Sequence, residues 1–267
     1  ERYDEEVKAQ DPTVSKSENN IETIEVFNAP QDVRVAIQKN QQELEKFVQQ
    51  GRDLTPVYKD VPANNVTFGI YTAEELTYTN EADIEPRAVE SDATVDSDTM
   101  VLPAGTLVGV MEIKDGQALM DEGLPYGKYY AQELSTDDNH VLDTNKYDFE
   151  LTAEDNETQK IVNVTEDPIL NYYKEGSFEL TKVDVADTSV VIPGAQITIY
   201  DENKNDIFTA NTDENGKIEL TRLPKGKYYF KETTAPLGYE LNEQEQAFEV
   251  KDNGEIVKCQ LTNQKTP

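Results

Sequence analysis

The chain has 267 residues, enough for about two ordinary domains. Asp and Glu number 54 and Lys and Arg 24, which gives a net charge of −30. A surface this acidic repels nucleic acids and anionic membranes, so we expect neither as a partner. The single cysteine, Cys259, excludes an internal disulfide, and no apolar run approaches the ~18 residues of a membrane span. No signal peptide or sorting signal is recognised, so we expect a piece of a longer protein.

Residues 1–31 end in a short alternating stretch that closes at Asn28. Such alternation is typical of a strand with one buried face. It favours either the last strand of an upstream repeat or an extra edge strand of the first complete domain, and the sequence leaves both open.

The first complete domain is expected over residues 32–172, with two insertions. The first insertion, about residues 40–65, begins with apolar residues at helical spacing and a glycine stop, which predicts a short amphipathic helix. The second, about residues 80–98, is acidic and predicts a long loop. The residues behind the predicted helix are Leu44, Phe47, Val48 and Gly51.

The second domain is expected over residues 173–267 and is compact. Phe178 and Leu180 alternate with polar residues, and Asn215-Gly216 is a hairpin-turn signal. Strands at short spacing, with little helix between them, predict an all-β sandwich for each domain.

One motif occurs twice along the chain. Pro-x-Gly-Lys-Tyr-Tyr-x-x-Glu runs from Pro125 to Glu133 and again from Pro224 to Glu232. A lysine ends a strand-like run before each copy, and an asparagine ends one after it. Lys, Glu and Asn therefore recur in this order, once per repeat: Lys39, Glu133 and Asn171, then Lys182, Glu232 and Asn263.

These six polar residues are expected to point into the apolar layers. Every second residue of a strand shares a face, and each of the six continues an apolar face, as Lys39 continues that of Val35 and Ile37. Burial lowers the pKa of a lysine and raises that of a glutamate. The lysine can then be a neutral nucleophile and the glutamate a protonated acid.

Such a trio can form a covalent bond. A neutral lysine amine beside an asparagine carboxamide can attack the amide carbon, while the glutamate moves the protons. Ammonia leaves, and a Lys–Asn isopeptide bond remains. The folded core holds the groups in contact and so makes a slow reaction feasible. The competing interpretation is a buried Lys–Glu ion pair that never reacts.

Five segments of the second domain form a specific pattern: Phe178–Asp184, Pro193–Tyr200, Leu223–Tyr229, Lys231–Tyr239 and Leu261–Asn263. Together they resemble the Cna B-type repeat of Gram-positive surface adhesins and pilins. The resemblance implies a transthyretin-like (prealbumin-like, Ig-like) β-sandwich with an intramolecular isopeptide bond. It implies that Lys182 and Asn263 are the bonded pair and Glu232 the catalytic acid.

The first domain resembles the same family more loosely, and tandem sandwiches are therefore expected. Lys39 and Asn171 are the expected bonded pair of this domain and Glu133 its acid. Lys59 is the rival lysine, because it lies closer to the strand around Phe68. The matching segments are Val66–Tyr71 and Leu124–Tyr130.

The resemblance implies a structural role outside the cell: a stalk or pilus-shaft segment of a wall-anchored Gram-positive surface protein. No cofactor and no turnover chemistry are expected, only one self-modification per domain. Neighbouring repeats of the polypeptide are the expected partners, and sortase would act on the full-length protein. Two alternatives stay open: an adhesin module that binds a host extracellular-matrix protein through the enlarged first domain, and a sortase-polymerised pilin joined to other pilus subunits.

Three other features are assigned ordinary roles. Cys259 is expected to be a small buried hydrophobe rather than a reactive thiol or half of a thioester. His140 has no partner by sequence, so no metal or catalytic role is expected. Residues 211–216 look like the start of a calcium loop, but Arg222 stands where such a loop needs Glu, and a hairpin turn is expected instead.

Overall fold

The computed structural model describes residues 32–79, 94–96, 99–120, 123–152 and 159–267. The predicted strand ending at Asn28 and most of the predicted loop 80–98 lie outside this part of the chain. The chain divides into two compact units. Unit 1 is built from residues up to Gln41, Val61–Asp138 and Leu142–Asn171, and unit 2 from Gln42–Asp60, Asn139–Val141 and Tyr172–Pro267.

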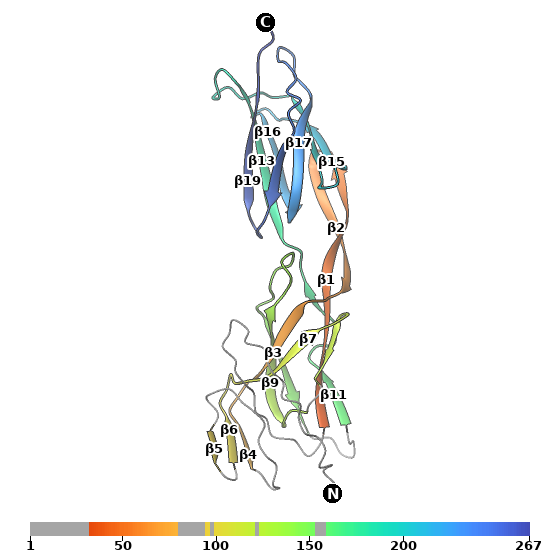
Figure 1. Ribbon diagram of the computed structural model, residues 1–267, viewed down its shortest axis with the longest axis vertical. Helices are drawn as coiled ribbons and strands as arrows, with labels where there is room; N and C mark the ends of the chain where they lie inside the picture. The colour runs from red at the N-terminus through yellow and green to blue at the C-terminus, as the bar shows by residue number, and fades with distance from the viewer. Residues whose placement is uncertain (1–31, 80–93, 97–98, 121–122, 153–158) are drawn as a thin grey trace. The chain divides into compact units, whose positions relative to one another are not determined.

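Every regular element of the described residues is a strand, which confirms the predicted all-β class (Figure 1). In unit 1, one sheet has the order β10-β9-β3-β7, and β1 pairs in parallel with β11 and β12 and antiparallel with β8. A small sheet, β4-β6-β5, places a strand inside the predicted loop 80–98, which is wrong to that extent. The bounds are β1 Asp32–Gln50, β3 Val66–Thr72, β4 Leu76–Thr79, β5 Thr94–Asp96, β6 Thr99–Leu102, β7 Leu107–Ile113, β8 Gln117–Leu119, β9 Gly127–Ser135, β10 Lys146–Leu151, β11 Gln159–Asn163 and β12 Ile169–Asn171.

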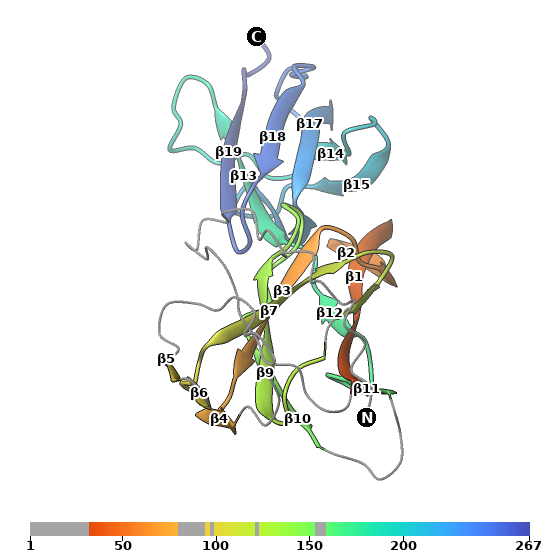
Figure 2. The ribbon, with the colours of Figure 1, turned by 60° about the horizontal axis from the view of Figure 1, so that its bottom comes forward.

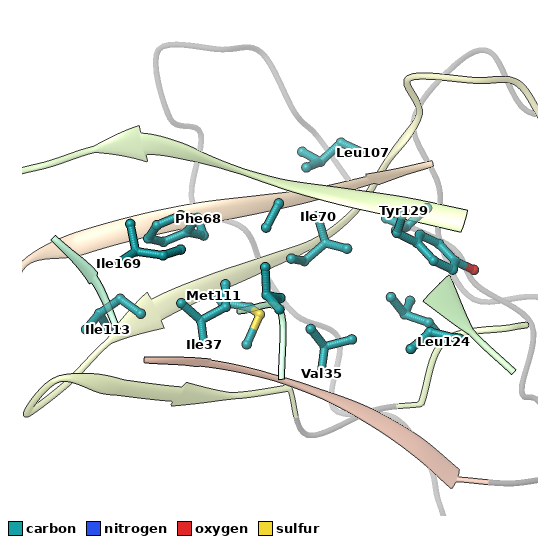
Figure 3. Close-up of a cluster of buried hydrophobic side chains, with 14 of the residues drawn as sticks. Val35, Ile37, Phe68, Ile70, Leu107, Met111, Ile113, Leu124, Tyr129 and Ile169 are labelled. Carbon is teal, nitrogen blue, oxygen red and sulfur yellow. The ribbon is translucent and has the colours of Figure 1, made fainter. Parts of the chain in front are cut away.

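The core of unit 1 lies between β1 and the four-stranded sheet. The alternating residues of β1 are buried, as their spacing predicted, and they pack with apolar residues of β3, β7 and β9 (Figure 3). Burial of this apolar surface is the main force that holds the two layers together. The residues drawn include Val35, Ile37, Phe68, Ile70, Met111 and Tyr129.

Unit 2 contains two sheets, β16-β13-β19 and β15-β14-β17-β18 (Figure 2). Within the first sheet, β13 lies parallel to β19, so the first and last of these seven strands are neighbours. Aromatic side chains fill the space between the sheets, with Phe178 and Phe248 stacked at a centroid distance of 4.0 Å. The bounds are β13 Glu175–Asp184, β14 Gln196–Tyr200, β15 Asp206–Asn211, β16 Lys217–Pro224, β17 Gly226–Thr234, β18 Gln246–Val250 and β19 Ile256–Asn263.

The repeated motif has a local structural reason. The first tyrosine of each copy, Tyr129 or Tyr228, is buried and donates its hydroxyl to the carbonyl of Pro125 or Pro224 at 2.7 Å. A buried tyrosine hydroxyl needs such a partner. The hydrogen bond fixes the turn that starts β9 or β17, and four residues after the tyrosine the strand presents its glutamate.

The predicted helix in the insertion 40–65 is wrong, because this segment is a long β-hairpin. β1 continues to Gln50, turns at Gly51 and returns as β2, Asp53–Pro62. Gly51 has a φ of 62°, a backbone conformation that glycine adopts without strain. A single turn or two of helix has little stability of its own, so packing decided the structure of this segment.

The hairpin supplies apolar side chains to unit 2. Leu54 is part of its buried core, and Phe47 packs against that core. Gln49 donates its amide to the carbonyl of Thr209 at 2.7 Å and accepts the Thr209 N–H at 3.0 Å. Since β15 is the outer strand of its sheet, Gln49 satisfies backbone groups that an exposed edge would leave open.

Polar contacts continue along the hairpin. The Arg52 guanidinium donates to the carbonyls of Asn211 and Lys217. Tyr58 donates to Glu175 at 2.9 Å, and Arg222 holds the same carboxylate with two hydrogen bonds. Residues 42–60 therefore belong to unit 2, although they precede most of unit 1 in sequence. The predicted domain limits, 32–172 and 173–267, do not foresee this exchange and stay a prediction.

Candidate cross-linking sites

Each unit buries one lysine, one glutamate and one asparagine. None of the six is more than 4% exposed, so the prediction that they face inward is confirmed. The structure brings them together in two clusters. Site 1 is Lys39, Glu133 and Asn171, and site 2 is Lys182, Glu232 and Asn263.

Parallel strands bring each lysine next to its asparagine. In unit 2, Asp184 of β13 is the register partner of Asn263 of β19, and Lys182 lies two residues earlier on the same face. In unit 1, Gln41 of β1 is the partner of Asn171 of β12. The same two-residue offset thus sets both pairs. Each glutamate comes from the facing sheet, through β9 or β17.

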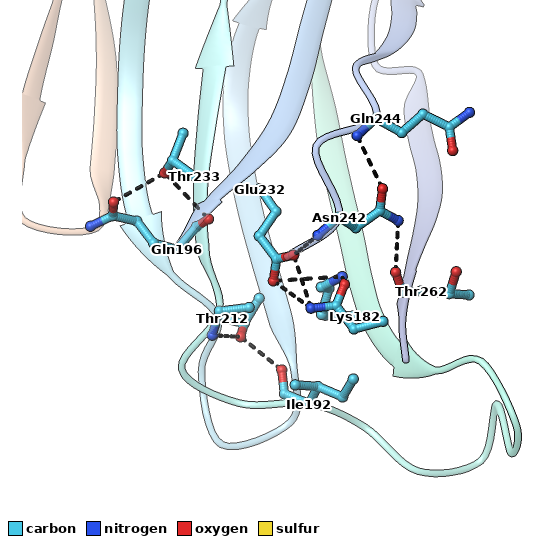
Figure 4. Close-up of polar contacts among 11 residues, drawn as sticks. Lys182, Ile192, Gln196, Thr212, Glu232, Thr233, Asn242, Gln244 and Thr262 are labelled. Carbon is cyan, nitrogen blue, oxygen red and sulfur yellow. Dashed lines mark hydrogen bonds and ion pairs between the residues drawn. The ribbon is translucent and has the colours of Figure 1, made fainter. Parts of the chain in front are cut away.

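Site 2 is a closed network (Figure 4). Lys182 Nζ donates to Asn263 Oδ1 and lies 3.8 Å from Glu232 Oε1. Asn263 Nδ2 donates to both oxygens of Glu232, at 2.8 and 2.9 Å. The N–H of Asn242 adds a further bond to Glu232 Oε2 at 2.8 Å, and the Asn242 side chain donates to the carbonyl of Thr262 at 2.8 Å. The glutamate therefore faces the nitrogen that would leave as ammonia.

Site 1 repeats the core of this arrangement. Lys39 Nζ donates to Asn171 Oδ1 at 2.7 Å and lies 3.5 Å from Glu133 Oε2. Asn171 Nδ2 donates to Glu133 Oε1 and to Thr136 Oγ1, both at 2.9 Å. The N–H of Asp143 reaches Glu133 Oε1 at 3.4 Å. Within the described residues, Glu133 Oε2 has no hydrogen-bond partner.

Burial shifts the proton affinities in the direction that the reaction needs. It lowers the pKa of Lys182 to about 8, against the opposing charge of Glu232. Burial likewise lowers the pKa of Lys39, opposed by Glu133 and Asp143. It raises the pKa of Glu133, opposed by hydrogen bonds and by the charge of Lys39. Burial therefore favours a neutral amine in both sites and a protonated carboxyl on Glu133 in site 1.

A glycine turn lies behind each lysine. The N–H of Lys39 donates to the carbonyl of Gly116 and that of Lys182 to Gly216, both at 2.8 Å. These glycines have φ values of 79° and 69°. A Cβ at Gly216 would lie 2.8 Å from the Lys182 carbonyl oxygen, so a larger residue has neither the conformation nor the room.

Comparison with known proteins assigns the fold of the second repeat. Residues 176–265 match the family model described as SpaA, prealbumin-like fold domain.

Residues 176–265 are therefore similar to SpaA-type prealbumin-like domains, and this region is called the SpaA-type domain below.

The resemblance predicted from five segments of the second domain is thus confirmed, and site 2 lies entirely within the SpaA-type domain.

Individual proteins show more distant likeness. A fibrinogen-binding protein of Staphylococcus epidermidis is 29% identical over 143 residues, which cover 49% of this chain and 13% of that protein. The Bacillus anthracis TIE protein superposes with a TM-score of 0.52 and 20% identity, over 86% of this chain and 57% of that one. The minor pilin GBS52 of Streptococcus agalactiae gives a TM-score of 0.34 and 16% identity, over 88% and 96% of the two chains. The TIE likeness concerns the fold alone, and the chain spans only part of the TIE and fibrinogen-binding proteins.

Sequence reasoning missed the residues that surround the two trios. Asp143 and Asn242 each stand ten residues after their glutamate, and this equal spacing could have identified them. Gly116 could have been found as the counterpart of Gly216 in the SpaA-type domain. Thr136 has no such signal, because Ala235 occupies the corresponding position of the second repeat.

The rival lysine lies elsewhere. Lys59 is on the hairpin, where its side chain is 52% exposed and pairs with Glu43 at 3.5 Å. The structure therefore places Lys39, and not Lys59, beside Glu133 and Asn171.

The remaining candidates have structural surroundings. Cys259 is half-buried at the edge of the SpaA-type core, and burial raises the pKa of its thiol. His140 is buried, and its Nε2 lies 2.7 Å from the carbonyl oxygen of Gln42. Asp213 accepts the N–H groups of Asn215 and Lys217, the pattern of a tight turn. The described residues contain no metal-binding group of three or more His, Cys, Asp and Glu, and no helix long and apolar enough to cross a bilayer.

Proposed function

We propose that this chain is a tension-bearing segment of a Gram-positive cell-surface protein, and that each unit closes itself with a Lys–Asn isopeptide bond. The observation that carries the proposal is the recurrence of site 1 and site 2. The two trios have the same residue types on equivalent strands, and in each the asparagine nitrogen donates to the glutamate. A buried Lys–Glu ion pair that never reacts would need neither the asparagine nor this recurrence.

The reaction balances within each trio. In site 2, the neutral Lys182 amine attacks Cγ of Asn263, and the Nζ–Cγ bond forms as the Cγ–Nδ2 bond breaks. Glu232 gives its proton to Nδ2, which leaves as ammonia, and takes a proton from the attacking amine in return. The Lys182 amine and the Asn263 carboxamide are already in hydrogen-bond contact, so positioning supplies much of the rate.

The connectivity gives the bonds a mechanical role. Tension applied to the chain passes from Lys39 to Asn171, along the short segment to Lys182, and from there to Asn263. The residues between each bonded pair are bypassed and cannot be extended. Without the site 2 bond, unfolding would release 81 residue steps, roughly 280 Å of chain.

Intact-mass spectrometry tests the proposal. The wild-type chain should be lighter than its sequence by two molecules of ammonia. Glu232→Ala should abolish the loss at Asn263 only, and Lys39→Ala the loss at Asn171 only. Lys59→Ala is the matched control and should keep both losses. A wild-type chain at its full calculated mass would overturn the proposal.

Host binding is the second candidate function. It is favoured by the likeness to a protein named for fibrinogen binding. Binding of the purified chain to immobilised fibrinogen, compared with immobilised albumin, tests it. Assembly by sortase into a pilus also stays a proposal, as does a location on the outer cell wall.

A further inference from the structure

Three side chains fasten unit 2 just beyond site 2: Asp184, Tyr239 and Lys265, together called the clip. Tyr239 donates its hydroxyl to Asp184 Oδ2 at 3.2 Å, and Lys265 Nζ lies 3.1 Å from the same oxygen. Asp184 Oδ1 accepts the N–H of Ala186 at 2.8 Å. The Asp184 side chain is 3% exposed, whereas that of Lys265 is 67% exposed. The clip thus joins a buried carboxylate, that of Asp184, to a lysine at the surface.

The clip joins the three chain segments that carry the site. Its members follow the reacting residues along the chain: Asp184 is two residues after Lys182, Lys265 two after Asn263, and Tyr239 seven after Glu232. Main-chain contacts reinforce the connection. Tyr239 and Lys265 form an isolated antiparallel bridge, and the N–H of Val185 donates to the carbonyl of Asn263 at 2.9 Å.

The other repeat has a related fastening, in which two of the three residues stand at corresponding positions and the third, Gln42, stands three residues after Lys39. His140 is seven residues after Glu133 and Tyr173 is two after Asn171, and they form the same kind of isolated bridge. Gln42 accepts from both, through its carbonyl to His140 Nε2 at 2.7 Å and through Oε1 to the Tyr173 N–H at 3.1 Å. Both repeats therefore have such a contact, but with different side chains. The clip contains the Asp184–Lys265 ion pair, whereas Gln42, His140 and Tyr173 are joined by hydrogen bonds.

We propose that the clip positions Asn263 for attack by Lys182, a role that rests on the proposed cross-link. Asp184 and Asn263 are register partners on neighbouring strands, so the Asp184–Lys265 contact holds the end of β19 against β13. Released from it, the end of β19 can separate and carry the carboxamide away from the amine. A misplacement of about 1 Å can slow a reaction by up to about 10²-fold. The clip touches no reacting atom, so its members are positioning residues.

The test follows bond formation in the full chain from the end of a short cell-free synthesis pulse. Mass spectrometry of peptides measures the Lys182–Asn263 and Lys39–Asn171 cross-links separately over time. Lys265→Ala should form the site 2 bond at least about tenfold more slowly than wild type. Tyr239→Phe should also slow the bond, but by less than Lys265→Ala. Lys265→Arg keeps the charge and should restore the wild-type rate.

Two controls separate positioning from stability. Lys258→Ala removes an equally exposed lysine of β19, 3.6 Å from Glu179, and should leave the site 2 rate unchanged. Site 1 in the same molecules should react at its usual rate. The clip's role is overturned if Lys265→Ala reacts at the wild-type rate, if Lys258→Ala slows site 2 equally, or if Lys265→Arg fails to restore it. Absence of both cross-links from the wild type would instead overturn the proposed function.

Discussion

Site 1 and site 2 contain the same three residue types but hold the glutamate differently. In site 2 both oxygens of Glu232 accept hydrogen bonds from Asn263, and a backbone N–H supports one of them. In site 1 the carboxamide of Asn171 is shared between Glu133 and Thr136, and one oxygen of Glu133 has no hydrogen bond among the described residues.

The difference separates what the proposed reaction needs from what can vary. Both sites keep a lysine against a carboxamide and a carboxyl on the leaving nitrogen. The support behind the carboxyl varies, as does the residue ten positions later, Asp143 or Asn242. Site 1 therefore holds its glutamate with fewer hydrogen bonds than site 2 does.

The largest expected effect comes from removing each acid in turn. Glu133→Gln and Glu232→Gln keep the shape of the side chain but cannot move the protons, so each should lack only its own bond. The loops that the bonds close span 132 and 81 positions, which corresponds to about 5 and about 4.5 kcal/mol of unfolding free energy. Thermal unfolding with intact-mass analysis measures both. If either variant retains both bonds, the two sites do not react independently through these acids.

The next largest effect is expected in the hairpin, which belongs to unit 2 although it precedes most of unit 1 in the sequence. Leu54→Ala should destabilise unit 2 by about 2–4 kcal/mol, because the side chain is part of that core. Thr55→Ala, at the exposed neighbouring position, is the control and should change little. Hydrogen exchange of each unit provides the measurement. Lower protection in unit 1 alone would contradict the assignment of the hairpin to unit 2.

The hairpin also shows where sequence reasoning stops. Alternation identified the buried faces around Lys39 and Lys182 because a two-residue period is a local property of a strand. The segment after Lys39 lacks that period, and Phe47, one of its apolar residues at helical spacing, packs against a core formed mainly by residues more than a hundred positions away. No local pattern carries that information, so the predicted helix was wrong.

The two trios could be predicted because their order repeats, whereas their surroundings could not. Gly116 and Thr136 act through backbone turns and one hydrogen bond, which leave weak traces in a single sequence. The buried contact of His140 with Gln42 joins segments that are distant in the chain, and nothing near either residue indicates it.

A third prediction concerns pH and applies to both sites. The reacting form has a neutral lysine and a protonated glutamate, which together hold as many protons as the ion pair. The fraction of molecules in the reacting form therefore does not change with pH near neutrality. Above about pH 8, to which burial lowers the pKa of Lys182, the pair loses that proton, and the site 2 rate should fall about tenfold per pH unit. Pulse synthesis followed by a shift in pH measures the rate, and a rate still rising above pH 8 would exclude Glu232 as the proton donor.

The smallest expected effect comes from changing Asp143, the residue of site 1 that corresponds to Asn242 of site 2. The charge of Asp143 favours the protonated form of Lys39, whereas site 2 has the neutral Asn242 at the corresponding position. Asp143→Asn makes site 1 resemble site 2 without changing the shape of the side chain. Because it removes a charge that opposes the neutral amine, it should speed the site 1 reaction by about two- to fivefold.

The comparison can be made inside one molecule. The ratio of the two cross-linked peptides over time reports site 1 against site 2, so differences in synthesis or folding of the whole chain cancel. Asp148→Asn removes an exposed carboxylate from β10 and controls for net charge. A change in the ratio with Asp143→Asn but not with Asp148→Asn would trace the difference between the sites to one local charge. An unchanged ratio would instead assign the difference between the sites to the hydrogen bonds around Glu133. The first of these to test is that of Thr136, which accepts a hydrogen bond from the carboxamide of Asn171.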